Sequence, residues 1–353
     1  MKRLFEFIRK ERLYLLLFIF VLLVTAIIMM PLESERKQSA AKVKVGLEKK
    51  EPVEDLAKKR EEVEELFTEN RDLALVFSLT SLLILLLLCL GIAVDLILLS
   101  SRLGKKELDI HTYKPQGQIS WGVWDVCRVV ILFMFFGYML IIIESSLIRI
   151  FPLVKNDNFR MILNSTILDT LGVVFIIYFT VGQYKEKFVS LGISFKNFFR
   201  NIFYGMVGYI ALIPILVVLL LAIAYISNLI KYVPEKQPVV ELFLKEKNAP
   251  LLIYTSLFAA IAGPIIEELF FRGFMYNAFK KYIGIFWATL ITAAMFAALH
   301  AHIVGFLPIL ALGMMLAYLY EKTGTLVSSI TVHMIHNLSM VLLVFLVKQI
   351  GAY

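Results

Sequence analysis

Long apolar segments separated by short polar ones run along most of the chain. They cover residues of about 13–30, 73–100, 121–151, 161–183, 202–230, 251–279, 283–303, 304–320 and 323–347. A helix of about 20 apolar residues crosses the hydrocarbon core of a bilayer, and most of these segments reach that length. The pattern therefore predicts an all-α fold, a polytopic membrane helical bundle with roughly eight to nine transmembrane helices.

The first apolar segment follows a basic start to the chain, made up of Lys2, Arg3, Arg9, Lys10 and Arg12. A secretory signal peptide has the same polarity, but its apolar stretch is shorter and a cleavage site of small residues follows it. The sequence Pro31-Leu32-Glu33-Ser34 does not provide such a site. We therefore interpret residues 1–30 as an uncleaved N-terminal membrane anchor, with the N-terminus in the cytoplasm.

Residues 31–72 form the one substantial hydrophilic stretch and are dense in Lys and Glu. Val53, Leu56, Val63 and Phe67 recur at roughly helical spacing, which predicts one amphipathic helix. A solvated connection between two long helices explains this stretch most simply. A partner-binding or short coiled-coil role is the alternative.

The overall composition agrees with a membrane protein, because 59% of the residues are hydrophobic, 18% are charged and the mean hydropathy is +0.80. A net charge of +8 is compatible with nucleic-acid binding, yet the basic residues are scattered at the ends of apolar segments. That distribution favours loops at the lipid surface, so we expect the bilayer as a partner and no nucleic acid. Only Cys89 and Cys127 occur, which excludes a disulfide framework or a cysteine metal site.

Two adjacent glutamates, Glu267 and Glu268, lie within the apolar segment 251–279, just after Pro264. A charged side chain at the bilayer centre costs about 3 kcal/mol or more, so ionisable residues there indicate function. Glu268 and Arg272 are four residues apart, a favourable spacing for an ion pair on a helix. Glu267 points to another side of the helix without a nearby partner in sequence, which suits a general base acting on water. The alternative is that both glutamates form structural ion pairs.

A histidine pair follows at the end of the next apolar segment. His300 lies one helical turn after Phe296 on the same face, so the aromatic ring is expected to shield or orient its imidazole. His302 points to a different side, and we favour His300 for the site because it lies further from the end of the segment. A satisfied core histidine is the alternative when His300 is considered alone.

The last apolar segment places His333 and Asn337 four residues apart on one helical face. Two neutral donors stacked in this way could both reach a developing oxyanion, as acyl transfer requires, whereas a polar helix contact is the alternative. His336 is expected to flank the site. No His-Glu-x-x-His motif occurs, although Glu267, His300 and His333 have the ligand types that zinc prefers.

Other charges in apolar segments stand nearly alone: Asp95, Glu144 and Asp169, and the pair Asp125 and Arg128 near the end of a segment. Asp125 and Arg128 are three residues apart, so they can pair with each other. We interpret all five as structural.

The three polar segments together resemble the CAAX prenyl endopeptidase and bacteriocin-processing family of intramembrane proteases, also called the Abi or CPBP family. The pattern of that family is Glu-Glu-x-x-x-Arg, then Phe-x-x-x-His, then His-x-x-x-Asn. This chain has Glu267-Glu268-x-x-x-Arg272, Phe296-x-x-x-His300 and His333-x-x-x-Asn337, in the same order. The likeness assigns residues 248–347 as catalytic helices and leaves the helices in 73–247 without a role.

The resemblance implies an all-helical fold with a polar cavity open to the cytosol. It implies that Glu267 activates water with His300, that His333 and Asn337 donate to the oxyanion, and that the others support them. Those supporting residues are Glu268, Arg272 and Phe296. It further implies a protein or peptide substrate, prenylated or not, in the plasma (inner) membrane of a prokaryote. No cofactor is required on this reading, with zinc as the alternative.

Two other functions fit the same residues. A proton-coupled transporter also needs carboxylates and histidines in the membrane, although we find no repeated halves in the chain. A non-catalytic immunity or scaffold protein could keep the motif for structure. The predicted helices also place Glu267 and His300 at different depths, unless the helices around residues 279 and 302 continue further or a re-entrant segment lies between them.

Overall fold

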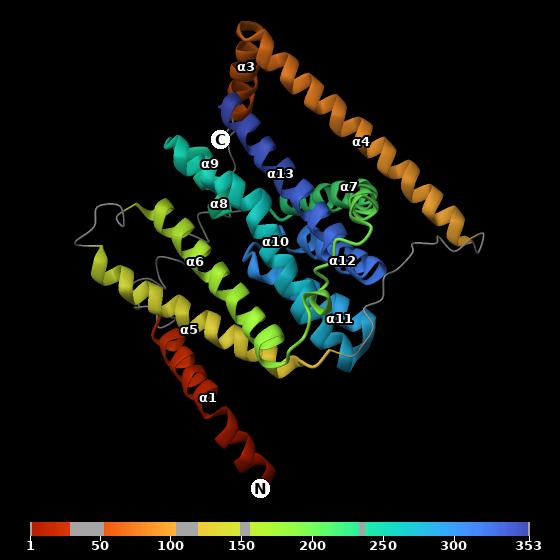
Figure 1. Cartoon of the computed structure of the whole chain (residues 1–353). Coiled ribbons are helices and arrows are strands. Elements are labelled where there is room, and N and C mark those ends of the chain that lie inside the picture. The colour runs from red at the N-terminus through yellow and green to blue at the C-terminus, as the bar shows by residue number, and fades with distance from the viewer. Residues whose placement is uncertain (1, 29–52, 104–118, 149–155, 233–236, 352–353) are drawn as a thin grey trace.

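Helices make up all of the regular structure in the part of the chain that the structure describes, residues 2–28, 53–103, 119–148, 156–232 and 237–351 of a computed structural model (Figure 1). The first half contains α1 (Lys2–Ile28), α3 (Val53–Glu69), α4 (Arg71–Leu103), α5 (Val123–Leu147), α6 (Asp157–Ile177), the π-helix η2 (Tyr178–Gln183), the 3-10 helix η3 (Phe188–Leu191) and α7 (Phe198–Leu229). The second half contains α8 (Pro238–Lys245), α9 (Ala249–Leu257), η4 (Phe258–Ala262), α10 (Gly263–Glu268), η5 (Leu269–Tyr276), α11 (Asn277–Leu299), α12 (Phe306–Thr323) and α13 (Leu326–Ile350).

The predicted polytopic helical bundle is confirmed, because seven helices in the described ranges are long and apolar enough to cross a membrane. They are Arg9–Ile28, Arg71–Ser101, Val123–Leu147, Asp157–Gln183, Phe198–Leu229, Ala249–Leu299 and Leu326–Ile350. The number differs from the eight to nine predicted. The predicted segments 251–279 and 283–303 fall within one helical run, and the segment 304–320 corresponds to α12, whose last turn carries Glu321 and Lys322 and is less apolar.

Gly284 breaks that long run. Its backbone lies at φ 75° and ψ 177°, a conformation that glycine adopts without a steric penalty. A straight helix of 51 residues would be roughly 75 Å long at about 1.5 Å per residue, far more than a bilayer core of about 30 Å. The break lets the second part of α11 return against η5 and α12. The two membrane segments predicted at 251–279 and 283–303 therefore correspond to one helical run with a break at Gly284.

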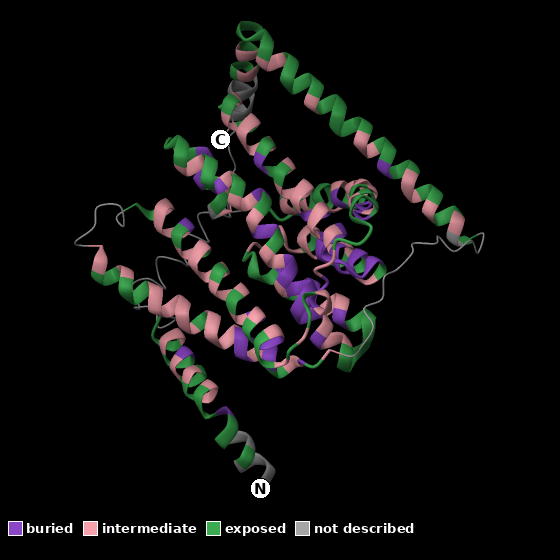
Figure 2. Ribbon diagram, viewed as in Figure 1, coloured by how far each residue is buried: buried purple, intermediate pink, exposed green. Residues whose placement is uncertain are grey.

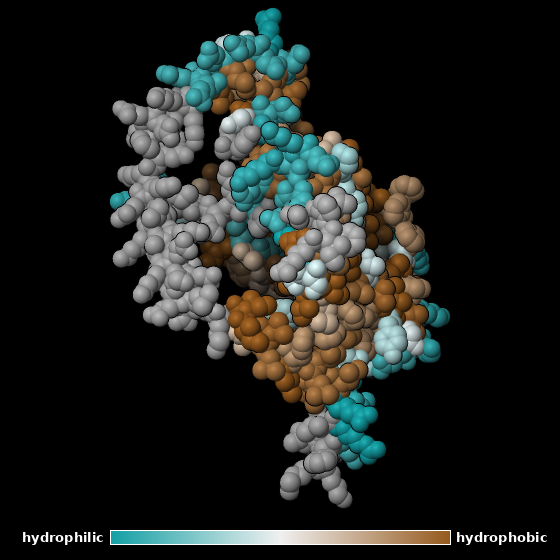
Figure 3. Space-filling view, turned by 90° about the vertical axis from the view of Figure 1, so that its left-hand side faces the viewer, coloured by the Kyte–Doolittle hydropathy of each residue, from teal (hydrophilic) through white to brown (hydrophobic). Residues whose placement is uncertain are grey.

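The buried core lies under the last quarter of the chain. Figure 2 shows buried residues concentrated around α10, α11 and α12, while α1 and α4 are mostly exposed or half-buried. Its large members include Trp121, Tyr276, Phe274 and Phe296. In the space-filling view, apolar side chains cover the middle of the visible face and hydrophilic ones gather above and below it (Figure 3). Such a band fits a body that spans a bilayer.

Helix α4 packs on α7 at Gly91. A Cβ at this position would lie 2.5 Å from Ile210 O and 2.7 Å from Pro214 Cδ, so a larger residue would push the helices apart. Pro214 lies inside α7 and has no N–H for the carbonyl four residues earlier, that of Ile210. Gly91 thus approaches the backbone where the proline leaves a carbonyl free.

Helix α1 is joined to α5 by a buried ionic cluster. Arg128 donates from Nη1 to Asp125 Oδ1 at 2.6 Å and from Nε to Glu11 Oε2 at 3.0 Å, with a further bond to the other oxygen of Glu11. Tyr184 Oη donates to Asp125 Oδ2 at 2.9 Å. The predicted pairing of Asp125 with Arg128 is confirmed, and α1 supplies an additional carboxylate.

The predicted amphipathic helix is present as α3, while residues 31–52 of that stretch lie outside the described residues.

Candidate active site

Glu268 occupies the centre of the polar residues in the core. It is fully buried, and its Oε1 accepts hydrogen bonds from Arg272 Nη1 at 2.7 Å and from His333 Nδ1 at 3.0 Å. The predicted ion pair of Glu268 with Arg272 is confirmed. Desolvation of a buried carboxylate is costly, and two donors on one oxygen offset part of that cost. Glu268 is therefore placed to orient its neighbours.

Arg272 links three helical segments. Beside its bond to Glu268, Nη2 donates to Gly313 O of α12 at 3.1 Å, and the guanidinium carbon lies 4.7 Å from the centre of the Phe296 ring. A Cβ on Gly313 would lie 3.0 Å from Ala293 Cβ, so glycine lets α11 and α12 pack closely here. The side chain of Arg272 is 1% exposed, which keeps water from weakening these contacts.

His333 lies between the two glutamates. Since Nδ1 faces the Glu268 carboxylate, it carries the proton, and Nε2 is turned toward Glu267. His333 Nε2 lies 3.7 Å from Glu267 Oε2, too far for a direct hydrogen bond but close enough for a shared small molecule. Glu267 Oε2 is buried without a hydrogen bond among the described residues, and its side chain is 35% exposed. Helix α13 thus supplies the partner that Glu267 lacks in its own helix.

Phe296 brings His300 and His333 together. Its buried ring meets the His300 ring edge-on with centres 4.8 Å apart, and the His333 ring with centres 5.5 Å apart. His300 caps the end of α11, and its Nδ1 lies 2.9 Å from Phe296 O. A carbonyl only accepts, so Nδ1 carries the proton and Nε2 of His300 is free to accept. Because the Phe296 ring contacts both His300 and His333, and His333 lies beside Glu267, the predicted difference in depth between Glu267 and His300 does not occur.

The loop after His300 is strained at Ala301, which has φ +48°. Side chains rarely adopt this left-handed conformation, and such strain is common beside functional residues. His302 has another role, because its Nδ1 accepts a hydrogen bond from Gly305 N at 2.9 Å and so caps the turn into α12. The preference for His300 over His302 stays a prediction, and this geometry favours it.

Asn337 closes a gap in the helix that carries the glutamates. In the π-helical turn η4, Gly263 N donates to Phe258 O, the carbonyl five residues earlier. The next bond in this pattern would run from Pro264 to Ala259 O. Proline has no N–H to donate. Asn337 Nδ2 donates to Ala259 O at 2.8 Å instead. The amide has two hydrogens, so one remains for the predicted oxyanion role.

His336 flanks this group from the side of α7. Its ring lies edge-on to Tyr209 with centres 6.0 Å apart. The Nδ1 atom is buried without a hydrogen bond in the described part of the chain. This position agrees with the flanking role predicted for it.

The residues do not fit a metal ion. Within the described ranges, no three His, Cys, Asp or Glu side chains converge as a metal site would require. His333 Nδ1 is directed at Glu268 Oε1 at 3.0 Å, so only Nε2 of this ring would remain for a metal. The alternative zinc set of Glu267, His300 and His333 is therefore not assembled in this arrangement.

One carboxylate near the site was interpreted as structural from the sequence. Asp169 lies on α6 and is half-buried within its apolar segment. Helix α6 contacts α10 and η5, which carry Glu267 and Arg272. Asp169 belongs to no motif and is distant from the glutamates in sequence, so only its unexplained position inside an apolar segment pointed to function.

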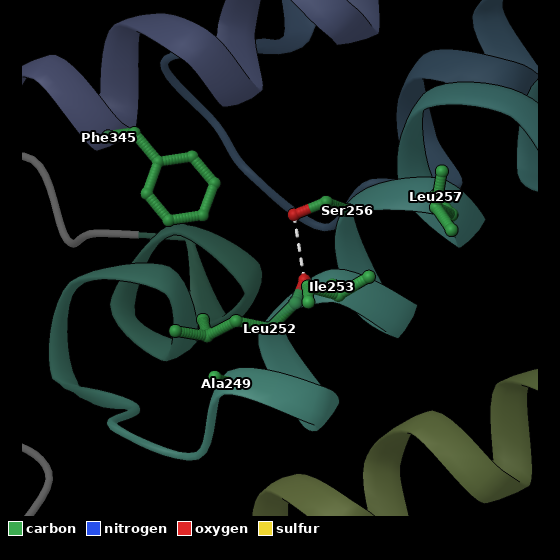
Figure 4. Close-up of a pocket in the computed structure, with 6 residues that line it drawn as sticks. All are labelled: Ala249, Leu252, Ile253, Ser256, Leu257 and Phe345. Atoms are coloured by element: carbon green, nitrogen blue, oxygen red, sulfur yellow. Dashed lines mark hydrogen bonds between the residues drawn. The ribbon is translucent and has the colours of Figure 1, made fainter.

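An apolar pocket of about 380 Å³ is lined by side chains along α9 and by Phe345 of α13 (Figure 4). Its lining residues are Ala249, Leu252, Ile253, Ser256, Leu257 and Phe345. The hydroxyl of Ser256 donates to Leu252 O at 2.7 Å, so it is satisfied within its own helix. None of the predicted site residues lines this pocket, and it offers no chemistry of its own.

Comparison with known proteins finds similarity in the last part of the chain. Residues 249–339 match the family model described as type II CAAX prenyl endopeptidase Rce1-like. A curated protein of Bacillus subtilis (strain 168), named putative membrane peptidase YdiL, is 33% identical over 94 residues, which is 27% of this chain and 37% of that protein. The match thus spans well under half of the relative. No solved structure matches. The family resemblance predicted from the three motifs is confirmed for this segment.

Proposed function

We propose that this multi-pass membrane protein, whose residues 249–339 are similar to the CAAX prenyl endopeptidases, is an intramembrane endopeptidase that uses Glu267 to activate water. The observation that carries the proposal is the position of His333. Arg272 and Glu268 fix one side of its ring, and its Nε2 faces Glu267 Oε2 at 3.7 Å. A carboxylate and an imidazole held in this way can bind one water molecule between them.

In the proposed reaction, Glu267 takes a proton from water as the water oxygen attacks the carbonyl carbon of the scissile amide. The amide carbonyl becomes an oxyanion in a tetrahedral intermediate. Glu267 then gives the proton to the leaving nitrogen as the C–N bond breaks, which returns the enzyme to its starting state. His300, whose Nε2 can accept a hydrogen bond, helps to orient the water.

The oxyanion needs donors that are fixed before the reaction begins. Asn337 offers its second amide hydrogen, since Ala259 O uses the first. His333 can donate from Nε2 only as an imidazolium, because its Nδ1 proton is directed at Glu268.

We propose that no cofactor is required, which is the reading that the arrangement of Glu267, His300 and His333 favours. Cleavage that survives exhaustive chelation is the expected result. Loss on chelation, restored by zinc alone, would contradict this part of the proposal.

The proposed substrate is a protein or peptide cleaved near its C-terminus or close to the membrane. The proposed location is the plasma (inner) membrane of a prokaryote with the N-terminus in the cytoplasm, as the basic residues in the first turns of α1 favour. A synthetic farnesylated C-terminal peptide, compared with the same peptide without the lipid, tests whether prenylation matters.

The test of the proposed function is mass spectrometry of membrane peptides from cells that carry wild-type protein or the Glu267→Gln variant. We expect cleavage products present with wild type to fall at least a hundredfold in the variant, because general-base catalysis contributes about 10²–10⁴-fold. Asp95→Asn is the matched control, since it removes an intramembrane carboxylate of α4 and leaves the site intact.

Equal products from wild type and Glu267→Gln, with equal amounts of inserted protein, would count against a protease and in favour of a scaffold. Transport driven by a pH gradient in proteoliposomes, lost in Glu267→Gln, would favour the proton-coupled transporter.

A further inference from the structure

The Phe296 ring is a shared support of the two histidines of the site, which come from α11 and α13. His300 Nδ1 lies 2.9 Å from Phe296 O. His333 Nδ1 lies 3.0 Å from Glu268 Oε1. One such contact fixes a single point of an imidazole, and the second torsion of a histidine side chain is soft, so the ring can still turn. The Phe296 ring meets both imidazoles edge-on and limits that turning.

Phe271, a residue of η5, contacts the Phe296 ring directly. The two ring centres are 5.1 Å apart and the planes meet at 83°, the edge-to-face arrangement that aromatic rings favour. Both side chains are buried. The Phe270 ring meets Phe271 edge-on in turn, with centres 5.0 Å apart. Phe271 is therefore supported within its own helix and offers Phe296 a fixed neighbour.

The guanidinium of Arg272 lies beside the same two rings. Its carbon is 4.7 Å from the centre of the Phe296 ring and 5.7 Å from that of Phe271. Arg272 is itself held by Glu268 and Gly313. Two adjacent residues of the π-helical η5, Phe271 and Arg272, thus reach the Phe296 ring together. The packing around that ring therefore joins η5 to both histidine helices.

We propose that Phe271 is a positioning residue of the site, whose ring keeps Phe296 in the orientation that holds both imidazoles. The inference rests on the proposed function, which requires fixed histidines. An aromatic ring turns easily about its second torsion unless its neighbours restrain it. Without the edge of Phe271, the Phe296 ring can tilt, and its contacts with His300 and His333 then loosen together. Phe271 stands at an unspecified position of the Glu-Glu-x-x-x-Arg motif, so the motif alone does not identify it.

The test uses the full-length protein, with isotope-labelled histidine, in lipid nanodiscs and records the imidazole nitrogens by solid-state NMR. No substrate is needed, and the chain has only five histidines. His300→Ala and His333→Ala assign the two sets of signals. In the wild-type protein we expect one sharp set for each, with the proton on Nδ1. Phe271→Leu keeps an apolar side chain but removes the flat ring, so both sets should broaden into a mixture of tautomers.

Phe274→Leu is the matched control. It removes another buried phenylalanine of η5, one that stacks on Trp121 with ring centres 6.0 Å apart and has no ring contact with Phe296 in the described structure. Both sets of signals should keep their wild-type form. Phe271→Met also lacks the ring at a similar volume, and it replaces the leucine variant if that protein does not fold.

Unchanged signals of His300 and His333 in a folded variant without the Phe271 ring overturn the inference. An equal change in Phe274→Leu overturns it as well, because the effect would then come from a general loosening of η5.

Cleavage measures the consequence for the reaction. We expect Phe271→Leu to lower the products that depend on Glu267 by about tenfold or more, because a small displacement of a positioned group can cost up to about 100-fold in rate. Products at the wild-type level despite altered histidine signals would contradict the role in positioning.

The two proposals fail separately. Unchanged histidine signals together with cleavage that depends on Glu267 overturn only the role of Phe271. Altered signals without any product that depends on Glu267 show that Phe271 holds the imidazoles, and they remove the catalytic meaning that the inference takes from the proposed function.

Discussion

At the scale of single residues, Glu268 and Glu267 differ in their hydrogen-bond partners. Glu268 Oε1 receives both Arg272 and His333, whereas Glu267 Oε2 has no hydrogen bond in the described structure. The spacing of four residues predicted the contact with Arg272, because that contact lies within one helix. The contact with His333 joins two helices, and neither spacing nor propensity carries that information.

Arg272→Met should destabilise the protein strongly. The change leaves the buried carboxylate of Glu268 without its cation, a loss of about 3–5 kcal/mol in the free energy of unfolding. Denaturant unfolding in detergent measures it. The double variant Glu268→Gln with Arg272→Met should recover much of the loss, because no uncompensated charge then remains. A single variant as stable as wild type would show that the pair is hydrated.

His300 and His302 offer a matched comparison. His300→Ala should reduce the cleavage products by at least tenfold, because it removes the imidazole held against Phe296. His302→Ala removes the cap on the turn before α12 and should change the products far less. Mass spectrometry of membrane peptides measures both variants. The reverse order of effects would exchange the roles assigned to the two histidines.

At the scale of elements, the glutamates lie on a short α-helix between two π-helical turns, η4 and η5. Such turns are rare and often occur at functional sites. Pro264 has no N–H to donate, and the turn before it, η4, takes the π-helical form. The π-helical hydrogen bonding of η4 could not be predicted from the sequence. It leaves Ala259 O without a backbone donor, and the side chain of Asn337 on α13 supplies one.

Gly91→Leu should separate α4 from α7, since even a Cβ would lie 2.5 Å from Ile210 O. We expect a loss of about 1–3 kcal/mol in stability, as for other overpacked positions. Ala93→Leu, on an exposed side of α4, is the control and should be close to neutral. Denaturant unfolding in detergent compares them. Similar stability of the two variants would mean that α4 does not pack on α7 at Gly91.

The turn between α8 and α9 predicts a dependence on pH. Backbone N–H groups of Asn248 and Lys247 and the side chain of Asn158 bind Glu246, which holds the pKa of this carboxyl below its usual 4.5. The stabilisation is therefore present above the unfolded pKa and is lost as the pH falls through the lower folded pKa. Glu246→Gln should remove this part of the acid dependence of unfolding. An unchanged acid dependence would contradict it.

At the scale of the whole molecule, hydropathy predicted the class of fold and the general position of most helices. It did not predict the number of membrane helices, because the break at Gly284 and the polar end of α12 are local features within apolar sequence. The motifs placed the site in the last quarter of the chain. The packing of α6 against α10 and η5 could not be predicted, since it joins helices that are distant in the sequence.

The bond from Asn337 to Ala259 O ties the final helix to a carbonyl 78 positions earlier, which Pro264 leaves without a donor. Because Pro264 withholds a donor, a residue elsewhere must provide one, and the two substitutions should not be independent. Pro264→Ala restores an amide hydrogen near the orphaned oxygen, so an accompanying Asn337→Leu should harm stability less than it does alone. A helix breaker in one membrane segment thus dictates which amino acid its neighbour can accept.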